Sequence, residues 1–292
     1  MELSSIADAL SGLQANQTYM DVVGNNIANV NTTAYKTQNI HFQDLLNQTT
    51  SYGNAKSGTL EGVNPTQVGM GVGQGSVDIV NTQGSVQDTG RTTDMAIQGT
   101  GYFVINDGKQ NFYTRDGSFS VAPDGTLTSG ASGMKVQGWQ AANGTVTTTA
   151  APTDIKIPLT KDPTNPNSPA LRGFSVGKDG TIIGAYDDGT SQPIAQVALT
   201  DFRNPDGLIR DGDNLYSAGV NAGQAQFQGT SNFGTAGSST LGTIGSGQLE
   251  GSNVDLAKQF ADMIQAQQGF NANTKVITTT NNMLQSVLAI VP

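Results

Sequence analysis

The sequence predicts an α+β protein whose two end helices pair, while the middle of the chain is all β-structure. Apolar residues recur every seven positions near both ends, and the middle holds short alternating strands separated by Asp-Gly and Asn-Gly turns. We therefore expect three parts. Residues 1–30 and 253–292 would form a coiled-coil domain, residues 31–75 an extended linker arm or hairpin, and residues 76–252 a β-rich outer domain.

The C-terminal repeat is the most regular pattern in the chain. Its apolar positions are Leu256, Met263, Phe270, Ile277, Leu284 and Val291, and the intervening seam positions are predicted to be Phe260, Gln267, Thr274, Asn281 and Leu288. This spacing predicts a long helix with a coiled-coil seam that is polar in its middle, which fixes register. Taken alone, the pattern also fits a terminal helix docked on its own domain.

A matching pattern at the N-terminus supplies a partner for that helix. Ile6, Leu13, Met20 and Ile27 form a seven-residue series between about Ser4 and Asn29, with Leu3 and Leu10 at the alternate positions. Matching seams at both ends predict that the two helices pair within one chain and that further copies cover them outside.

The segment that follows differs in composition. Ile40, Phe42, Leu45 and Leu46 make one amphipathic patch, and glycines then alternate with Val68, Met70 and Val72 up to Gly75. We interpret residues 31–75 as an extended arm or a long hairpin that its own chain covers only in part.

The middle of the chain predicts antiparallel β-structure. Short apolar or alternating runs at 77–80, 95–97, 102–105, 112–114, 118–121 and 194–202 are separated by turn residues. Residues 123–127 and 178–182 both contain Asp-Gly-Thr and predict the same hairpin used twice. A short Pro-rich link is expected at 160–170.

Composition excludes several function classes. A net charge of -9 argues against nucleic-acid binding, which requires a basic face. The absence of cysteine excludes disulfides, thiolate zinc sites and cysteine nucleophiles. We expect no membrane insertion, because no run approaches 18 apolar residues, and no cleavable signal peptide, because the first residues lack a basic region and an apolar core.

Catalytic chemistry has little support in the sequence. His41 is the only histidine, lies in the arm and has no nucleophile motif to serve, so we interpret it as an exposed arm residue. The aspartates at 211–214 and 187–189 lack the glutamate of a calcium loop and predict turns. The glycine run at 69–75 lacks a P-loop ending, and Trp139 is expected in the sheet or core. We predict no enzyme, no cofactor and no metal.

Three segments carry a family resemblance. Residues 11–36 contain Ser-Gly-Leu and then Asp-Val-Val-Gly-Asn-Asn-Ile-Ala-Asn-Val-Asn-Thr-Thr-Ala-Tyr-Lys, residues 94–119 contain Asp-Met-Ala-Ile-Gln-Gly-Thr-Gly-Tyr-Phe, and residues 247–270 contain Gly-Gln-Leu-Glu-Gly-Ser-Asn-Val-Asp-Leu. In this order they resemble the signatures of bacterial flagellar rod and hook proteins. The signature residues carried over are Asn25, Asn26, Ile27, Ala28, Asn29, Asn253 and Asp255.

Within that family, the segments at 135–139, 151–158 and 180–186 look most like hook proteins. A typical hook protein carries an outer domain between the segments matching Pro158 and Gly173, and this chain has only the Pro-rich link there. Distal rod proteins also lack that domain, so the distal rod stays an alternative.

The resemblance implies a tubular homopolymer that passes torque from rod to filament as a flexible joint. It implies export through the type III apparatus without leader cleavage, a place in the extracellular hook or basal body, and contact with rod, hook-cap and hook–filament junction proteins. The assembly interface would comprise Ile6, Leu10, Leu13, Met20, Ile27, Leu256, Phe260, Met263, Phe270, Ile277, Leu284, Leu288 and Val291. A secreted, trimeric β-rich binding protein and a hydrolase on a β-scaffold are weaker alternatives.

Overall fold

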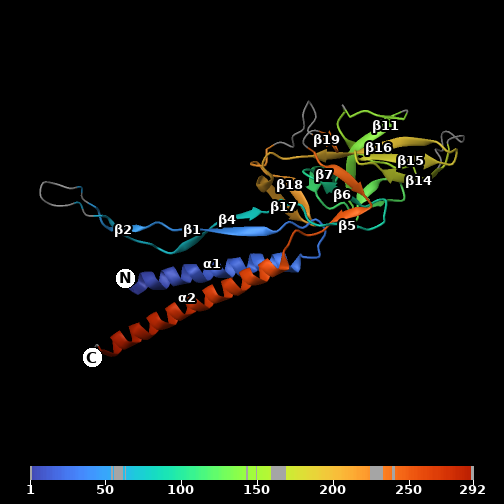
Figure 1. Ribbon diagram of the computed structural model, residues 1–292. Coiled ribbons are helices and arrows are strands. Elements are labelled where there is room, and N and C mark those ends of the chain that lie inside the picture. The colour runs from blue at the N-terminus through green and yellow to red at the C-terminus, as the bar shows by residue number, and fades with distance from the viewer. Residues whose placement is uncertain are drawn as a thin grey trace. The chain divides into compact units, whose positions relative to one another are not determined.

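The chain separates into two units in the computed structural model shown in Figure 1, which describes residues 2–53, 55, 62, 64–142, 144–148, 150–158, 169–223, 233–238 and 241–290. The helical unit contains residues Met1–Val30, Thr37–Val80 and Val254–Pro292. The β unit contains residues Asn31–Lys36 and Asn81–Asn253. Segments far apart in the sequence therefore meet inside each unit.

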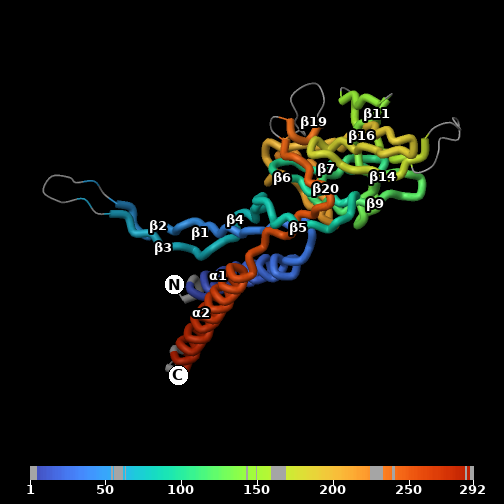
Figure 2. Tube along the Cα trace, turned by 45° about the vertical axis from the view of Figure 1, so that its right-hand side comes forward, coloured from blue at the N-terminus to red at the C-terminus, as the bar shows by residue number. Residues whose placement is uncertain are grey.

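The helical unit consists of two long helices and a hairpin. Helix α1 spans Glu2–Ala28, helix α2 spans Leu256–Ile290, and the two lie side by side in both overall views (Figure 2). They run antiparallel, because Gly12 approaches Asn273 while Asn26 bonds Gln259. The predicted pairing of the two terminal helices within one chain is confirmed.

The segment predicted as an arm or hairpin is a hairpin in two sections. Strand β1 (Gln38–Asp44) pairs with β4 (Val72–Ile79), and farther out β2 (Gln48–Ser51) pairs with β3 (Thr66–Val68), both antiparallel. The alternating glycines at 73 and 75 lie in β4, where a Cβ would approach Leu45 or the carbonyl of His41. The glycines thus allow the strand to lie close against its partner.

The β unit is built from short antiparallel strands. Its main sheet has the order β14-β15-β16-β11-β7-β8-β18-β17, with β9, β10, β12, β13 and β19 paired beside that path. The remaining strands form the pairs β20–β6 and β21–β5. The bounds are β5 Val86–Asp88, β6 Met95–Gln98, β7 Tyr102–Asn106, β8 Asn111–Thr114, β9 Phe119–Val121, β10 Leu127–Ser129, β11 Lys135–Ala142, β12 Thr145–Val146, β13 Thr153–Asp154, β14 Leu171–Val176, β15 Thr181–Tyr186, β16 Ser191–Thr200, β17 Leu208–Gly212, β18 Leu215–Ala218, β19 Gly234–Thr235, β20 Thr243–Ser246 and β21 Gln248–Glu250.

The core of the β unit is aliphatic and aromatic. Phe103 and Phe119 are fully buried and meet edge to face, with ring centroids 5.1 Å apart. Ile155 and Ile182 are also fully buried in this cluster. Trp139 is buried as predicted, and its Nε1 donates a hydrogen bond to the Ala150 carbonyl at 2.7 Å. These contacts make the β unit a packed body of its own.

The repeated Asp-Gly-Thr hairpin is confirmed. Gly125 and Gly180 both adopt positive φ, and in each turn the preceding aspartate accepts hydrogen bonds from the backbone N–H and the hydroxyl of the following threonine. A third copy at residues 188–190, between β15 and β16, repeats the same bonds. Aspartate, glycine and threonine therefore fix the turn through local hydrogen bonding and left-handed backbone.

One further turn prediction is confirmed. Asp213 and Asn214 take positive φ between β17 and β18, which matches the predicted turn at 211–214. Most of the predicted Pro-rich link at 160–170 lies outside the described residues. Neither described helix combines the length and the hydropathy that crossing a bilayer requires.

Candidate assembly surface and the residues that position it

The contacts that join α1 to α2 include small and polar residues. Gly12 approaches Asn273, Gly269 approaches Asn16, and the buried side chains of Asn26 and Gln259 are hydrogen-bonded. Small side chains let two helix backbones approach closely, so the pair is held by close packing and amide hydrogen bonds.

The burial pattern corrects the predicted seam of α2. The predicted alternate positions Phe260, Gln267, Thr274, Asn281 and Leu288 are all exposed. The positions one residue earlier, Gln259, Ala266, Asn273 and Thr280, are buried or half-buried. Of the predicted seven-residue series, Met263, Phe270, Ile277 and Leu284 are half-buried, whereas Leu256 is exposed. Together with the positions one residue earlier, they alternate in steps of three and then four. Hydrophobicity alone favours the exposed positions, because the alternate positions that are buried or half-buried are polar or small.

Several large apolar side chains of the two helices are exposed. Leu10 is 49% exposed on α1, and Phe260 and Leu288 are 51% and 72% exposed on α2. Large apolar side chains are seldom left this accessible in groups unless another surface covers them. We use the name apolar stripe for all the large apolar residues that are exposed on the described parts of the two helices, which are Leu10, Leu256, Phe260, Ile264, Val276, Met283 and Leu288.

The other predicted interface residues are half-buried in the single chain. These are Ile6, Leu13, Met20, Ile27, Met263, Phe270, Ile277 and Leu284, while Val291 lies outside the described residues. Half-burial leaves area on each side chain that a second copy could cover.

Asn26, a signature residue, joins three elements of the helical unit. Its side-chain Nδ2 donates to the Gln38 carbonyl at 2.9 Å and to Gln259 Oε1 at 3.0 Å. Its Oδ1 accepts from the Gln38 backbone N–H at 3.0 Å. The side chain is 1% exposed, so these bonds satisfy a buried amide and tie α1, β1 and α2 together.

The other helical signature residues act locally. Asp255 caps α2, since its Oδ1 accepts from the N–H groups of Ala257 and Lys258 at 2.9 and 3.3 Å. At the end of α1, Asn29 Nδ2 donates to the Asn25 carbonyl at 2.9 Å, and Ala28 is exposed. These residues fix where the helices begin and end.

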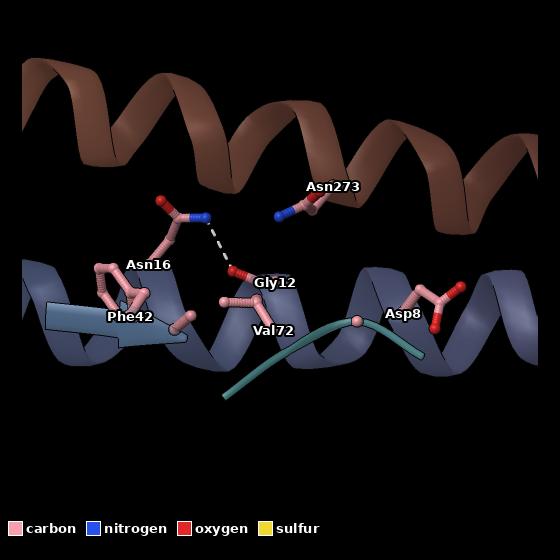
Figure 3. A pocket seen from close by; sticks show the side chains of 8 residues that line it. Asp8, Gly12, Asn16, Phe42, Val72 and Asn273 are labelled. Atoms are coloured by element: carbon pink, nitrogen blue, oxygen red, sulfur yellow. Dashed lines mark hydrogen bonds between the residues drawn. The ribbon is translucent and has the colours of Figure 1, made fainter. Parts of the chain in front are cut away.

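A hollow of about 380 Å³ opens beside the helix pair, as Figure 3 shows. Its lining is Asp8, Gly12, Ala15, Asn16, Phe42, Gly71, Val72 and Asn273. Gly71 has φ +95°, and a side chain there would collide with Ser11, whose hydroxyl accepts a hydrogen bond from the Val72 N–H at 3.2 Å. Glycine at position 71 thus allows the hairpin to pack closely against α1.

His41 lies where an exposed arm residue was predicted. It is in β1 with a 63% exposed side chain, and its Nε2 is 3.3 Å from Asp78 Oδ2. No group of three or more His, Cys, Asp or Glu residues within the described part of the chain could hold a metal ion.

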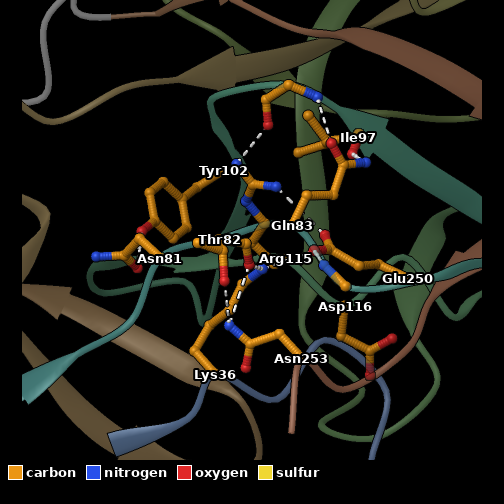
Figure 4. A network of polar contacts seen from close by, with 12 residues as sticks. Lys36, Asn81, Thr82, Gln83, Ile97, Tyr102, Arg115, Asp116, Glu250 and Asn253 are labelled. Atoms are coloured by element: carbon orange, nitrogen blue, oxygen red, sulfur yellow. Dashed lines mark hydrogen bonds and ion pairs between the residues drawn. The ribbon is translucent and has the colours of Figure 1, made fainter. Parts of the chain in front are cut away.

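A buried polar cluster that the sequence did not single out lies in the β unit (Figure 4). Glu250 Oε1 accepts from Lys36 Nζ at 2.6 Å and from the Gly84 N–H at 2.9 Å, and its Oε2 is 3.3 Å from Arg115 Nη1. The Lys36 and Glu250 side chains are 2% and 0% exposed. We call Lys36, Arg115 and Glu250 the polar clamp.

The clamp balances the cost of burying its charges. Burial lowers the pKa of Lys36, and the neighbouring Glu250 carboxylate offsets part of that shift. Lys36 Nζ also donates to the Thr82 carbonyl at 2.8 Å, and Arg115 Nη2 donates to the Gly99 carbonyl at 2.6 Å. Removing one partner would leave an uncompensated buried charge.

The clamp cross-links segments that end the β unit. Lys36, Thr82 and Asn253 lie within two residues of points where the chain passes between the units. Asn253, a signature residue, donates from Nδ2 to the Thr82 carbonyl at 3.1 Å, and its N–H donates to the Tyr35 carbonyl. Arg210 lies over the Tyr35 ring at 4.9 Å and donates to the Lys36 carbonyl. Hydrogen bonds within the β unit thus join three places at which the chain passes from one unit to the other.

Known protein families match this chain in the same three regions that carry the resemblance in sequence. Profiles described as flagella basal body rod protein, flagellar hook protein FlgE/F/G D1 domain, and flagellar basal body rod FlgEFG protein C-terminal match residues 8–36, 96–184 and 246–290. The chain is 37% identical to the flagellar basal-body rod protein FlgG of Bacillus subtilis over 286 positions, covering 98% of each chain. It is 27% identical to the flagellar hook protein FlgE of Borreliella burgdorferi over 443 positions, covering 98% of this chain and 99% of that protein.

Proposed function

The chain belongs to the flagellar rod and hook protein family, and from this we propose that it is a structural subunit that self-assembles into the flagellar hook. The observation that carries the proposal is the apolar stripe. Leu10 and Phe260 are about half exposed, so the pairing of α1 with α2 leaves much of both side chains uncovered. A second copy would cover the stripe, and repetition of that heterologous contact builds a tube.

The hook-like segments of the sequence support the hook in particular. Residues 135–139 open β11, the strand that pairs with β7, β13 and β16, and residues 151–158 include the fully buried Ile155. Residues 181–186 of the third segment form β15, whose neighbours are β14 and β16. The segments that resemble hook proteins therefore contribute β11, β13 and β15 to one sheet.

The distal rod is the second candidate, and chain length favours it. The alignment with the Bacillus subtilis rod protein spans 286 positions and covers both chains almost end to end. Alignments with the hook proteins of Borreliella burgdorferi and Treponema pallidum span 443 and 466 positions, so those hook proteins carry segments that this 292-residue chain lacks.

The proposal includes location and partners. The subunit would leave the cell through the type III export apparatus without leader cleavage. Its neighbours would be copies of itself, rod proteins, the hook cap and the hook–filament junction proteins. The polymer would transmit torque and would need no catalytic residue.

The test is the position of the protein in isolated hook–basal bodies, detected by gold-labelled antibody against the β unit. Label along the curved segment outside the cell envelope is expected for a hook subunit. Label confined to the straight rod would overturn the hook assignment in favour of the distal rod. The concentrated protein should also form tubes with helical symmetry in electron micrographs, and discrete trimers would contradict a polymer subunit.

A further inference from the structure

One five-residue pattern occurs in both helices of the helical unit. Helix α1 contains Gly12-Leu13-Gln14-Ala15-Asn16, and helix α2 contains Gly269-Phe270-Asn271-Ala272-Asn273. Both segments have the form Gly-x-x-Ala-Asn. Because the helices are antiparallel, the glycine of each pattern lies opposite the asparagine of the other.

The contacts at these positions are close and reciprocal. A Cβ added to Gly12 would lie 2.5 Å from Asn273 Nδ2, and a Cβ added to Gly269 would lie 2.6 Å from Asn16 Oδ1. Asn16 is itself held, since its Nδ2 donates to the Gly12 carbonyl at 2.7 Å. In Figure 3, Asn16 projects from α1 toward α2, and Asn273 projects from α2 toward Gly12.

We infer that Gly12, Asn16, Gly269 and Asn273 form a reciprocal lock that sets the register of α1 against α2. A slide of one helical turn, about 5.4 Å, changes every partner in the lock. In one direction Asn16 meets Asn273, and two amide side chains compete for the space that one occupies. In the other direction Gly12 meets Gly269, which leaves a void between the backbones. The paired register alone fills both positions.

The lock positions the apolar stripe, and this consequence rests on the proposed function. The stripe takes Leu10 from α1 and Phe260 from α2, so the register decides how these side chains line up for the next copy. Gly12, Asn16, Gly269 and Asn273 are therefore positioning residues for assembly. They act through the placement of the stripe, and touching the neighbouring subunit is not required of them.

A swap tests the lock, because the chain already contains both orientations of the pair. Asn16 on α1 faces Gly269 on α2, so Gly12→Asn combined with Asn273→Gly recreates that orientation one turn away. Gly12→Asn alone should lower the yield of sedimentable tubes by about tenfold or more, as overpacking of a close contact predicts. The swapped double variant should recover to within about twofold of the unchanged chain.

Gly24→Asn is the matched control. Gly24 lies in the same helix as Gly12, and a Cβ added to it would have open space within 4 Å. This variant measures how much replacing glycine by asparagine in α1 lowers the yield of tubes at a position outside the lock. A double variant that assembles no better than Gly12→Asn would overturn the lock. Equal losses from Gly12→Asn and Gly24→Asn would do the same.

A distance measurement tests register separately from assembly. The chain has no cysteine, so Gln17→Cys and Gln268→Cys, at exposed positions of α1 and α2, accept one spin label each. The labelled full-length chain is measured after dilution with unlabelled chain. The double variant Gly12→Asn with Asn273→Gly should give the same distance between the two labels as the chain with the four original lock residues. Gly12→Asn should shift or broaden it by several ångströms, up to about one turn of 5.4 Å. An unaltered distance in Gly12→Asn would overturn the lock, whereas failure of the unchanged chain to form tubes would overturn only the proposed function.

Discussion

Asn26 and Gln259 are bonded side chain to side chain, with Asn26 Nδ2 donating to Gln259 Oε1 at 3.0 Å, although 233 residues separate them in sequence. The same Asn26 amide completes a pair of hydrogen bonds with the backbone of Gln38. Asn26, a family signature residue near the end of α1, thus fixes the positions of β1 and α2 relative to that helix. Such a fully satisfied buried amide specifies geometry, because every alternative leaves a polar group unpaired.

Asn26→Asp should weaken the helical unit with almost no change in shape. The carboxylate keeps one acceptor for the Gln38 N–H, but it loses the donors to the Gln38 carbonyl and to Gln259. We expect destabilisation of about 1–3 kcal/mol or more, because buried acceptors would then face a buried charge. The midpoint of thermal disassembly of tubes measures the effect.

Gln17→Glu is the control for that substitution, because it makes the same chemical change at an exposed position of α1. An equal drop in both variants would show that charge on α1, and not the Asn26 hydrogen bonds, controls assembly.

Phe260→Asp should abolish tube formation while leaving the single chain folded. Phe260 is 51% exposed, so the substitution costs the isolated chain little, but it would bury an unpaired charge once a second copy covers the stripe. Circular dichroism reports the fold and sedimentation reports assembly. Normal assembly of Phe260→Asp would contradict the interface assigned to the stripe.

Met263→Asp is the companion variant. Met263 is half-buried on the apolar series of α2, so this substitution should lower both helical content and assembly. The contrast between Phe260 and Met263 separates contacts between copies from contacts within the chain.

Glu250→Gln should destabilise the β unit. The neutral amide leaves Lys36 and Arg115 buried without a counter-charge, and removal of one partner from a buried pair typically costs about 3–5 kcal/mol. Denaturant unfolding followed by Trp139 fluorescence measures the loss, since that indole is buried in the β unit. Asp187→Asn should change little, because the Arg172–Asp187 pair is exposed.

The turn aspartates should titrate at unusually low pH. The Thr126 hydroxyl and then its backbone N–H donate to Asp124 and hold the pKa of that carboxyl below its ordinary value, and Thr190 does the same to the pKa of Asp188. The stabilisation is therefore complete above the unfolded-state pKa and is lost as pH falls through the lower folded-state pKa.

NMR titration of the side-chain carboxyl carbons measures these values. Thr126→Val removes the hydroxyl and should raise the pKa of Asp124 while the pKa of Asp188 stays in place. A pKa of Asp124 that did not move would show that the hydroxyl bond is not the cause of the shift.

The repeats and turns of the fold were predictable because their causes are local. The helices follow from a seven-residue period, and the hairpins at 123–127 and 178–182 follow from residues that bond within the turn itself. Whether Phe260 or Gln259 faces α1 could not be decided in this way. Both positions fit a seam, and hydrophobicity favours Phe260 over the polar Gln259.

The amino-acid sequence by itself determined the class of fold, the places of its turns and its family signatures, since each depends on short-range order in the chain. Its matching seven-residue repeats also predicted the pairing of its two ends. Tertiary structure alone decided which face of each helix is used, that Gly12 meets Asn273, and that Lys36, Arg115 and Glu250 share one buried clamp. Those relationships join residues more than a hundred positions apart or depend on a difference of one residue in register. Only packing of the whole chain selects them, because each is stabilised by the space and the unpaired polar groups that its distant partner supplies.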